Sequence, residues 1–127
     1  MFSILNRNEY KDSKARNMSS LVDVLKYAGY DVMWYENDGG CKGVCDRVNN
    51  ETITPYDPKN RKYCKDGTCF DEVLIGKLKS RLKIAADKKK STVIFLHIIG
   101  SHGPTYASRV PENMKVFKPN CRSGEIE

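Results

Sequence analysis

Two histidines lie in the same stretch of this chain, and one of them is placed for chemistry. Residues 93–99 (VIFLHII) form an apolar, β-branched run that stops at Gly100 and is followed by His102 in the sequence GSHGP. Such a run predicts a strand buried on both faces of a mostly parallel sheet, and ligands of these sheets bind outside the carboxyl ends of the strands. An imidazole there can bind zinc when neutral and phosphate when protonated. His97, inside the run, predicts a hydrogen-bonded core histidine and not a ligand.

Lys42 is the second candidate, because it follows the end of another expected strand. Residues 31–35 predict a short strand, and the sequence NDGG at 37–40 is typical of a turn after it. Lysine is a compact point charge that suits a phosphate group. Asn37 and Asp38 lie on the same turn and could line the same pocket.

Five cysteines complete the set of reactive residues: Cys41 and Cys45, Cys64 and Cys69, and Cys121. The members of the two pairs are four and five positions apart across glycine-containing segments, which permits disulfides in tight loops. The competing interpretation is a zinc site made by four thiolates, although the cysteines of such sites are usually separated by two residues. Free thiols are the third interpretation. In an exported protein, the odd cysteine would indicate a missing partner.

Helices and strands alternate among the elements expected to position these residues. The chain predicts a helix over 18–29 that opens at Ser19 or Ser20 and closes at Gly29, a strand over 31–35, a helix over 71–88 and a strand over 91–99. The second helix is expected to carry an apolar face made by Leu74, Leu78, Leu82 and Ala85, widened by Ile75 and Ile84. Residues 41–69 predict a long loop held by the cysteines. This alternation predicts an α/β fold with helices packed over a parallel sheet.

Length and charge limit the possible classes. With 127 residues the chain is at most one domain, its longest apolar run is far shorter than the roughly 20 residues of a membrane-spanning helix, and no signal peptide is visible. Much of the net charge of +6 comes from residues 77–90, which we interpret as a solvated helix face. The aromatic residues are not interleaved with the basic ones as in stacking platforms. We therefore expect no nucleic-acid partner, and an anionic membrane surface fits the charge better.

Three motifs together carry a resemblance to a known family. They are GCKGVCDR at 40–47, CKDGTCFDEVL at 64–74 and GSHGPTY at 100–106. With these motifs the chain closely resembles the lipid A phosphoethanolamine transferases, sulfatase-like enzymes of the alkaline phosphatase superfamily that include the mobile colistin-resistance proteins. The resemblance implies a partial α/β/α sandwich with a mostly parallel sheet and a disulfide-stapled loop region. Residues 1–127 would form a single partial domain, the middle segment of a periplasmic catalytic domain.

The resemblance also implies roles for individual residues. It favours disulfides for Cys41 with Cys45 and for Cys64 with Cys69, and a partner for Cys121 beyond the end of this chain. His102 would lie beside zinc and phosphate, as a ligand of a second metal or a donor to phosphoryl oxygens. Lys42 would approach the phosphate of phosphoethanolamine. The nucleophilic threonine and one acidic zinc ligand would lie upstream of this segment, and an Asp-His pair and a further histidine downstream.

The expected function is that of a segment of a phosphoethanolamine transferase. Such an enzyme moves phosphoethanolamine from phosphatidylethanolamine to lipid A or a lipopolysaccharide core sugar through a zinc-activated threonine, and it confers polymyxin resistance. The parent protein would work at the periplasmic face of the bacterial inner membrane and reach the membrane surface through an N-terminal part outside this chain. The isolated chain would be inactive. The alternative is a non-catalytic, disulfide-stapled module that binds phosphate headgroups, and a basic nucleic-acid-binding protein is the least favoured class.

Overall fold

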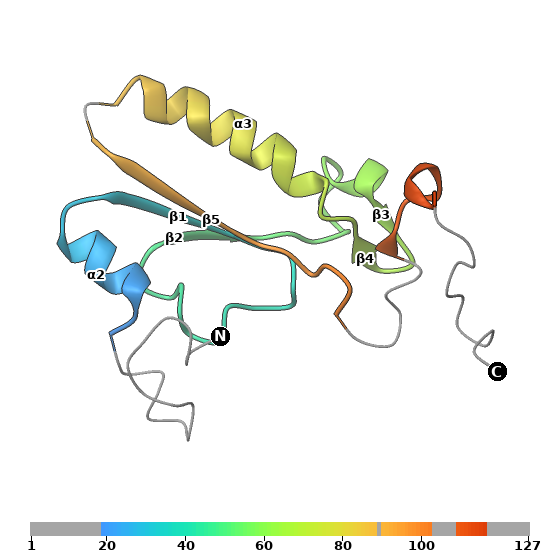
Figure 1. Cartoon of the computed structure of the whole chain (residues 1–127), viewed down its shortest axis with the longest axis horizontal. Helices are drawn as coiled ribbons and strands as arrows, with labels where there is room; N and C mark the ends of the chain where they lie inside the picture. The colour runs from blue at the N-terminus through green and yellow to red at the C-terminus, as the bar shows by residue number, and fades with distance from the viewer. Residues whose placement is uncertain (1–18, 89, 103–108, 117–127) are drawn as a thin grey trace.

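A three-stranded parallel sheet with one helix on each face forms the centre of the computed structural model, which describes residues 19–88, 90–102 and 109–116. The strand order is β2-β1-β5, with β1 at Asp31–Glu36, β2 at Asn49–Thr52 and β5 at Thr92–His97. Helix α3 (Val73–Ala86) covers one face of the sheet and the shorter α2 (Leu21–Tyr27) lies on the other (Figure 1). The predicted α/β/α arrangement with a parallel sheet is confirmed.

Helix α2 begins and ends at residues that the sequence identified. The side chain of Ser20 caps the amino terminus by accepting from the amide of Asp23, and the Asp23 carboxylate accepts from the Ser20 amide in return. This reciprocal pair is a capping box. Ala28 is the C-cap, and Gly29 follows it with φ of +93°, the left-handed conformation that glycine adopts most easily. The helix is nonetheless shorter than the predicted range of 18–29.

Strand β1 is the core of the sheet, and all six of its residues are buried. Its side chains alternate between the two faces, as the period of a strand requires. Val32 and Trp34 pack with Val22 of α2. Met33 and Tyr35 join the cluster that contains the first residues of α3, Val73 and Leu74. Burial on both faces explains why the four residues between Asp31 and Glu36 are large and mainly apolar.

Strand β5 is not buried on both faces, contrary to the prediction from its apolar sequence. All six of its residues are only partly buried, and within the described residues the strand pairs with β1 alone. It is therefore an outer strand of the sheet that the described residues form. The strand also ends at His97, two residues before the predicted limit, and Ile98 is exposed.

The segment at 41–69, predicted to be a long loop, contains short strands and a 3₁₀ turn that the sequence pattern did not predict. Strand β2 has the sequence NNET, and it pairs in parallel with β1 in the register Met33↔Asn49. A short 3₁₀ turn at Arg61–Tyr63 leads into a hairpin of β3 (Cys64–Lys65) and β4 (Thr68–Cys69). Asp66 and Gly67 join these two strands with positive φ at both positions, as in a type I′ turn.

The apolar face predicted for the second helix is buried only at its beginning. Val73 and Leu74 are the residues of α3 that reach the core. Ile75, Leu82 and Ile84 are about half exposed. Beyond α3 and β5, a 3₁₀ turn at Glu112–Met114 is the last described element. No helix in the described part of the chain is long and apolar enough to span a membrane.

Both predicted disulfides are present. Cys41 is bonded to Cys45 in the loop after β1, and Cys64 is bonded to Cys69 across the hairpin. These bonds exclude the alternative in which the four sulfurs hold a zinc ion as thiolates. Cys121 lies outside the described residues.

Candidate functional site

The two candidate residues leave adjacent strands at one edge of the sheet. Strands β1 and β5 run parallel, and their last residues, Glu36 and His97, are register partners. Lys42 follows β1 and His102 follows β5, so both lie beyond the carboxyl ends of neighbouring strands. This is the edge at which ligands of open α/β sheets bind.

His102 presents an exposed imidazole that is held on one side. Its side chain is 76% exposed, and Nδ1 lies 3.3 Å from Oδ1 of Asp38. The backbone amide of His102 donates to the carbonyl oxygen of Ile99, and the Arg109 guanidinium donates to the His102 carbonyl. The carboxylate beside Nδ1 leaves Nε2 as the nitrogen available to a ligand.

Asp38 joins His102 to a second histidine and to a buried carboxylate. Its Oδ2 lies 3.8 Å from Nε2 of His97, whose Nδ1 is 2.6 Å from Oε2 of Glu36. Glu36 also accepts a hydrogen bond from Nε1 of Trp34 and one from the backbone amide of Asp38. The two histidines and two carboxylates thus form one chain of contacts along the edge of the sheet. His97 is packed and hydrogen-bonded, as the sequence predicted.

Glu36 is charged although its side chain is 1% exposed. Burial alone would raise its pKa, because a low dielectric disfavours the carboxylate. The hydrogen bonds from Trp34, His97 and the Asp38 amide outweigh burial and hold the pKa of Glu36 below its ordinary value. A fixed negative charge therefore stands at the end of β1, directly behind the candidate site.

Asp71 is a site residue that the sequence analysis missed. Its Oδ1 accepts from the amide of Ile99 at 2.9 Å, and its Oδ2 accepts from the amide of Gly100 at 2.8 Å. These bonds fix the turn that carries His102. Its position directly before α3 is the only local signal in the sequence, and an acidic residue there also complements the helix macrodipole.

Asn37 connects the same turn to the disulfide hairpin. Its side-chain amide donates to the carbonyl of Cys69 and to Oδ1 of Asp71. Asn37 is 8% exposed, whereas the side chain of Asp38 is 24% exposed. The hydrogen bonds of Asn37 thus hold the turn and the hairpin, whereas Asp38 contacts His102. That the two residues line a substrate pocket stays a prediction.

Lys42 stands in a strained loop with its side chain exposed to solvent. Its φ is +54°, unusual for a residue with a side chain, and the flanking Gly40 and Gly43 also have positive φ. The loop is closed by the disulfide and anchored by Val44, which is 1% exposed. Within the described residues Lys42 makes no hydrogen bond or ion pair. Strain of this kind collects at functional sites.

A cavity of about 330 Å³ lies beside the turn that carries His102. It is enclosed by the start of α3, the end of the β5 segment and the last 3₁₀ turn, with Phe70, Asp71, Gly100, Arg109 and Met114 among its lining residues. The cavity therefore reaches Gly100 and Ser101, the residues that precede His102 in its turn.

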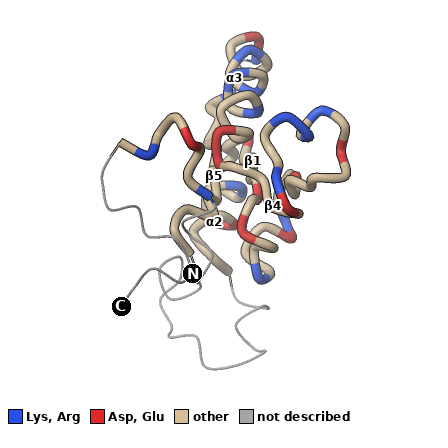
Figure 2. Tube along the Cα trace, turned by 90° about the vertical axis from the view of Figure 1, so that its right-hand side faces the viewer, with Lys and Arg blue, Asp and Glu red and all other residues tan. Residues whose placement is uncertain are grey.

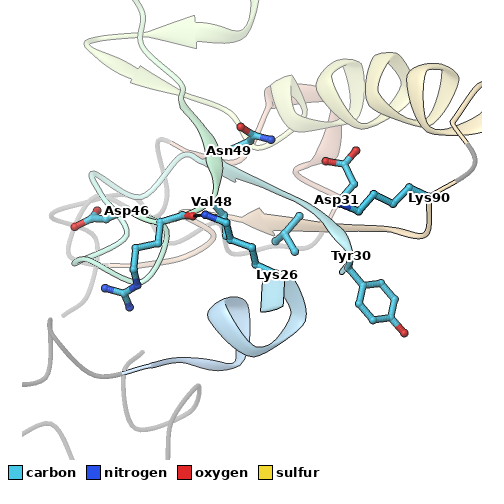
Figure 3. Close-up of a pocket in the computed structure, with 9 residues that line it drawn as sticks. Lys26, Tyr30, Asp31, Asp46, Val48, Asn49 and Lys90 are labelled. Atoms are coloured by element: carbon cyan, nitrogen blue, oxygen red, sulfur yellow. Dashed lines mark hydrogen bonds between the residues drawn. The ribbon is translucent and has the colours of Figure 1, made fainter. Parts of the chain in front are cut away.

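A larger cavity, of about 440 Å³, lies at the opposite edge of the sheet (Figure 3). It is lined by residues at the amino ends of the strands, such as Asp31 and Asn49, together with Lys26, Arg47 and Lys90. Lys26 donates to the carbonyl oxygen of Arg47 across this cavity. It lies at the amino ends of the strands, whereas Lys42 and His102 follow the carboxyl ends of β1 and β5, so its greater volume does not make it the candidate site.

Part of the positive charge on α3 is neutralised within the chain. Figure 2 shows Lys and Arg at several places along this helix. Lys77 pairs with Glu51 of β2, and Arg81 pairs with Asp31 at 2.7 Å. Lys88, just after the helix, pairs with the same carboxylate at 2.9 Å. The net charge therefore overstates the positive charge that α3 presents to a binding partner.

The described residues hold one group of three possible metal ligands, namely Cys41, Cys45 and Asp46. Because both cysteines are in a disulfide, this group offers one free donor, the carboxylate. His102 can contribute one imidazole nitrogen to a metal, with the rest of the ligand set coming from elsewhere.

Comparison with known proteins finds matches over nearly the whole chain. A family model described as Sulfatase matches residues 1–126. The phosphoethanolamine transferase EptA of Salmonella typhimurium is 42% identical over 127 residues, which is 100% of this chain and 22% of that protein. The phosphatidylethanolamine transferase Mcr-1 of Escherichia coli is 30% identical over 130 residues, 99% of this chain and 24% of that protein. The chain thus spans about a quarter or less of the length of these relatives.

Solved structures give the same result. The integral membrane protein lipooligosaccharide phosphoethanolamine transferase A of Neisseria meningitidis matches with a TM-score of 0.77 and 40% identity, over 98% of this chain and 22% of that one. The soluble domain of the same transferase matches with a TM-score of 0.75 and 39% identity, over 98% and 36%. The resemblance inferred from the three motifs is confirmed.

Proposed function

Because the chain belongs to the sulfatase family, we propose that it forms one wall of the active site of a phosphoethanolamine transferase. The reaction moves phosphoethanolamine from phosphatidylethanolamine to lipid A or to a core sugar of lipopolysaccharide. One observation carries the proposal: the loop with Lys42 and the turn with His102 leave adjacent parallel strands at the same edge of the sheet. Relatives named as phosphoethanolamine and phosphatidylethanolamine transferases support the choice of substrate.

The two residues act on the phosphoryl group in different ways. His102, with Asp38 beside Nδ1, directs Nε2 toward a phosphoryl oxygen or a metal. Lys42 supplies a positive charge from a loop that the disulfide keeps rigid. Both stabilise the negative charge that develops on the phosphoryl oxygens during transfer, as preorganised donors do.

Zinc and the nucleophile belong to the proposed enzyme as a whole. His102 suits zinc, because an imidazole oriented by a carboxylate is a common zinc ligand, and Asp38 is the carboxylate beside it. Among the described residues no group of three possible ligands includes His102. Zinc, when bound, would polarise the phosphoryl oxygens and lower the pKa of a nucleophilic hydroxyl. That nucleophile is a threonine outside this chain, so we expect the isolated chain to bind without turnover.

The periplasmic face of the bacterial inner membrane is the proposed location. Disulfides persist in oxidising compartments such as the periplasm, and two are present here. A structural relative is described as the periplasmic domain of the phosphoethanolamine transferase EptC of Campylobacter jejuni, with a TM-score of 0.66 and 35% identity over 84% of this chain and 30% of that one.

Transfer activity of variants tests the proposal. In a full-length transferase that contains this segment, His102→Ala and Lys42→Ala should each lower the rate of lipid A modification about 10²–10³-fold, since each removes a donor to the transition state. Lys79 is an exposed lysine on α3, so Lys79→Ala is the matched control and should leave the rate unchanged. If both site variants turned over at the normal rate while the segment still bound phosphate headgroups, the result would favour the alternative, in which this segment is a binding module without a catalytic role.

A further inference from the structure

We propose that Asn37 is a positioning residue, whose side chain ties the turn that carries His102 to the end of β1. This inference rests on the proposed function, in which His102 and Lys42 act on the same phosphoryl group. The loop with Lys42 is already anchored to β1, because its disulfide and Val44 belong to the buried cluster around Trp34. The tie through Asn37 therefore gives both groups one common frame.

The pairing of the strands does not reach His102. Strands β1 and β5 are in register up to Glu36 and His97, and the amide of Asn37 adds one more bond, to the carbonyl oxygen of His97. Within the described residues, the backbones of the two segments make no hydrogen bond to each other beyond that point. His102 follows only after Gly100, whose φ is +53°. Side chains must therefore support the turn if His102 is to keep one position.

Asp71 supplies this support. Its Oδ1 accepts from the amide of Ile99 at 2.9 Å, and its Oδ2 accepts from the amide of Gly100 at 2.8 Å. Two carboxylate oxygens on two successive amides fix the turn, provided that the carboxylate itself keeps one place. Asp71 lies just before α3, outside the sheet. A link from its carboxylate to the sheet thus decides where the turn lies.

Asn37 makes that link. Its Nδ2 donates to Oδ1 of Asp71 at 2.8 Å and to the carbonyl oxygen of Cys69 at 3.0 Å. Both partners are acceptors, so the side chain must present its N–H₂ group to them, and its orientation is determined. Asn37 is 8% exposed, and a hydrogen bond to a carboxylate is stronger than one between neutral groups. Asn37 thus joins the end of β1 to the start of α3 and to the turn after β5.

The contact between Asp38 and His102 has a different consequence. Oδ1 of Asp38 lies 3.3 Å from Nδ1 of His102, whose side chain is 76% exposed. This contact acts on the orientation of the imidazole ring, and water competes for both groups. Asn37 acts through Asp71 on the backbone of the turn, and so on the distance between His102 and Lys42.

Hydrogen exchange of the 127-residue chain tests the tie without turnover. Asn37→Asp keeps the shape of the side chain and replaces its N–H₂ group by an acceptor, whereas Asn37→Ala removes the donors without adding charge. In both variants the amides of Ile99 and Gly100 should exchange about 5-fold faster, as the loss of one typical hydrogen bond allows. Wild-type exchange at these amides in both folded variants would overturn the proposal.

Asn60→Ala is the matched control. Asn60 is 3% exposed, and its side-chain amide donates to the carbonyl oxygen of Thr54 at 3.1 Å, within its own loop. The variant also removes a buried donor, so it should lower the thermal midpoint. It should leave the exchange of the Ile99 and Gly100 amides unchanged.

Turnover of a full-length transferase containing the segment tests the consequence for the site. Asn37→Ala should lower kcat about 10- to 100-fold with KM little changed, because a misplacement of about 1 Å can cost about 10²-fold. A residue that acts through His102 has no further effect once that imidazole is gone. In the His102→Ala background, Asn37→Ala should therefore leave kcat unchanged. Asn60→Ala should leave kcat unchanged in both backgrounds.

Two results of this cycle would overturn the proposal. One is an equal fold-loss from Asn37→Ala in the wild-type and His102→Ala backgrounds, which would indicate a general effect on the fold. The other is a normal kcat in Asn37→Ala beside an inactive His102→Ala. If His102→Ala were fully active while the Asn37 variants still exposed the Ile99 and Gly100 amides to exchange, the proposed function would fail and the tie would stand.

Discussion

Lys42 combines an unfavourable backbone conformation with an exposed charge. Its effect on stability and its effect on transfer activity can therefore be measured separately. Its φ of +54° costs a non-glycine residue about 1–3 kcal/mol. Lys42→Gly removes that strain together with the charge. We predict that the thermal midpoint of the variant is equal to or above that of the wild type, whereas transfer by the full-length enzyme falls about 10²–10³-fold. A lysine present only for the stability of the loop would show the opposite pattern.

Asp71 should act on the His102 turn through hydrogen bonds alone. Its two carboxylate oxygens accept from the amides of Ile99 and Gly100 and from the side chain of Asn37. An asparagine at this position directs an N–H₂ group at one of these donors, so Asp71→Asn should cost about 1–3 kcal/mol of stability. Hydrogen exchange at the Ile99 and Gly100 amides measures the local effect. Protection equal to that of the wild type would contradict the assigned role.

Asp23 should give the fold a defined acid dependence. The hydrogen bond from Arg47 is the largest cause that lowers the pKa of this carboxyl from 3.8 to about 2. A pKa lowered in the folded state adds stability above the unfolded value, and the gain is lost as pH falls from about 4 to about 2, a loss of about 2 kcal/mol. Urea unfolding at a series of pH values from about 5 to about 2 measures this dependence of stability on pH. Asp23→Asn should flatten it.

At the scale of elements, local sequence patterns predicted those helices and strands in which apolar residues occupy the buried positions. Ser20 is the N-cap of α2, and Gly29 follows its C-cap with positive φ. The middle of β1 is apolar because the strand is covered on both faces. Strand β2 could not be predicted in this way, because its polar residues remain mostly exposed and only its pairing with β1 makes it a strand. The Asp66-Gly67 turn carried a hairpin signal that was overlooked.

The disulfides should stabilise the segment that lacks a core of its own. Each closes a loop of a few residues, which places its contribution at roughly 2 kcal/mol, near the low end of the usual range. We predict that the Cys64→Ser, Cys69→Ser double variant has a free energy of unfolding roughly 2 kcal/mol lower than the wild type and a correspondingly lower urea midpoint. Alkylation of the unreduced chain should label Cys121 alone. Labelling of a second cysteine would contradict the pairing.

For the whole molecule, the sequence predicted that the candidate residues leave adjacent strands at one end of the sheet, but it did not predict the contacts that hold them there. The ends of two expected strands indicated the edge that carries Lys42 and His102, because strand ends are local features. The support of His102 by Asp38, and of its turn by Asp71, joins residues far apart in the chain. Such contacts depend on the register of β1 against β5, which no local pattern contains.

Chemical rescue of His102 tests the central claim most directly. In a full-length transferase containing this segment, His102→Gly should lower turnover about 10²–10³-fold at an unchanged thermal midpoint. Imidazole added to the assay should restore part of the activity, because it can enter the space left at the exposed edge of the sheet and supply the missing nitrogen. Turnover close to that of the wild type in His102→Gly, without imidazole and with the fold intact, would contradict the claim that this edge handles the phosphoryl group.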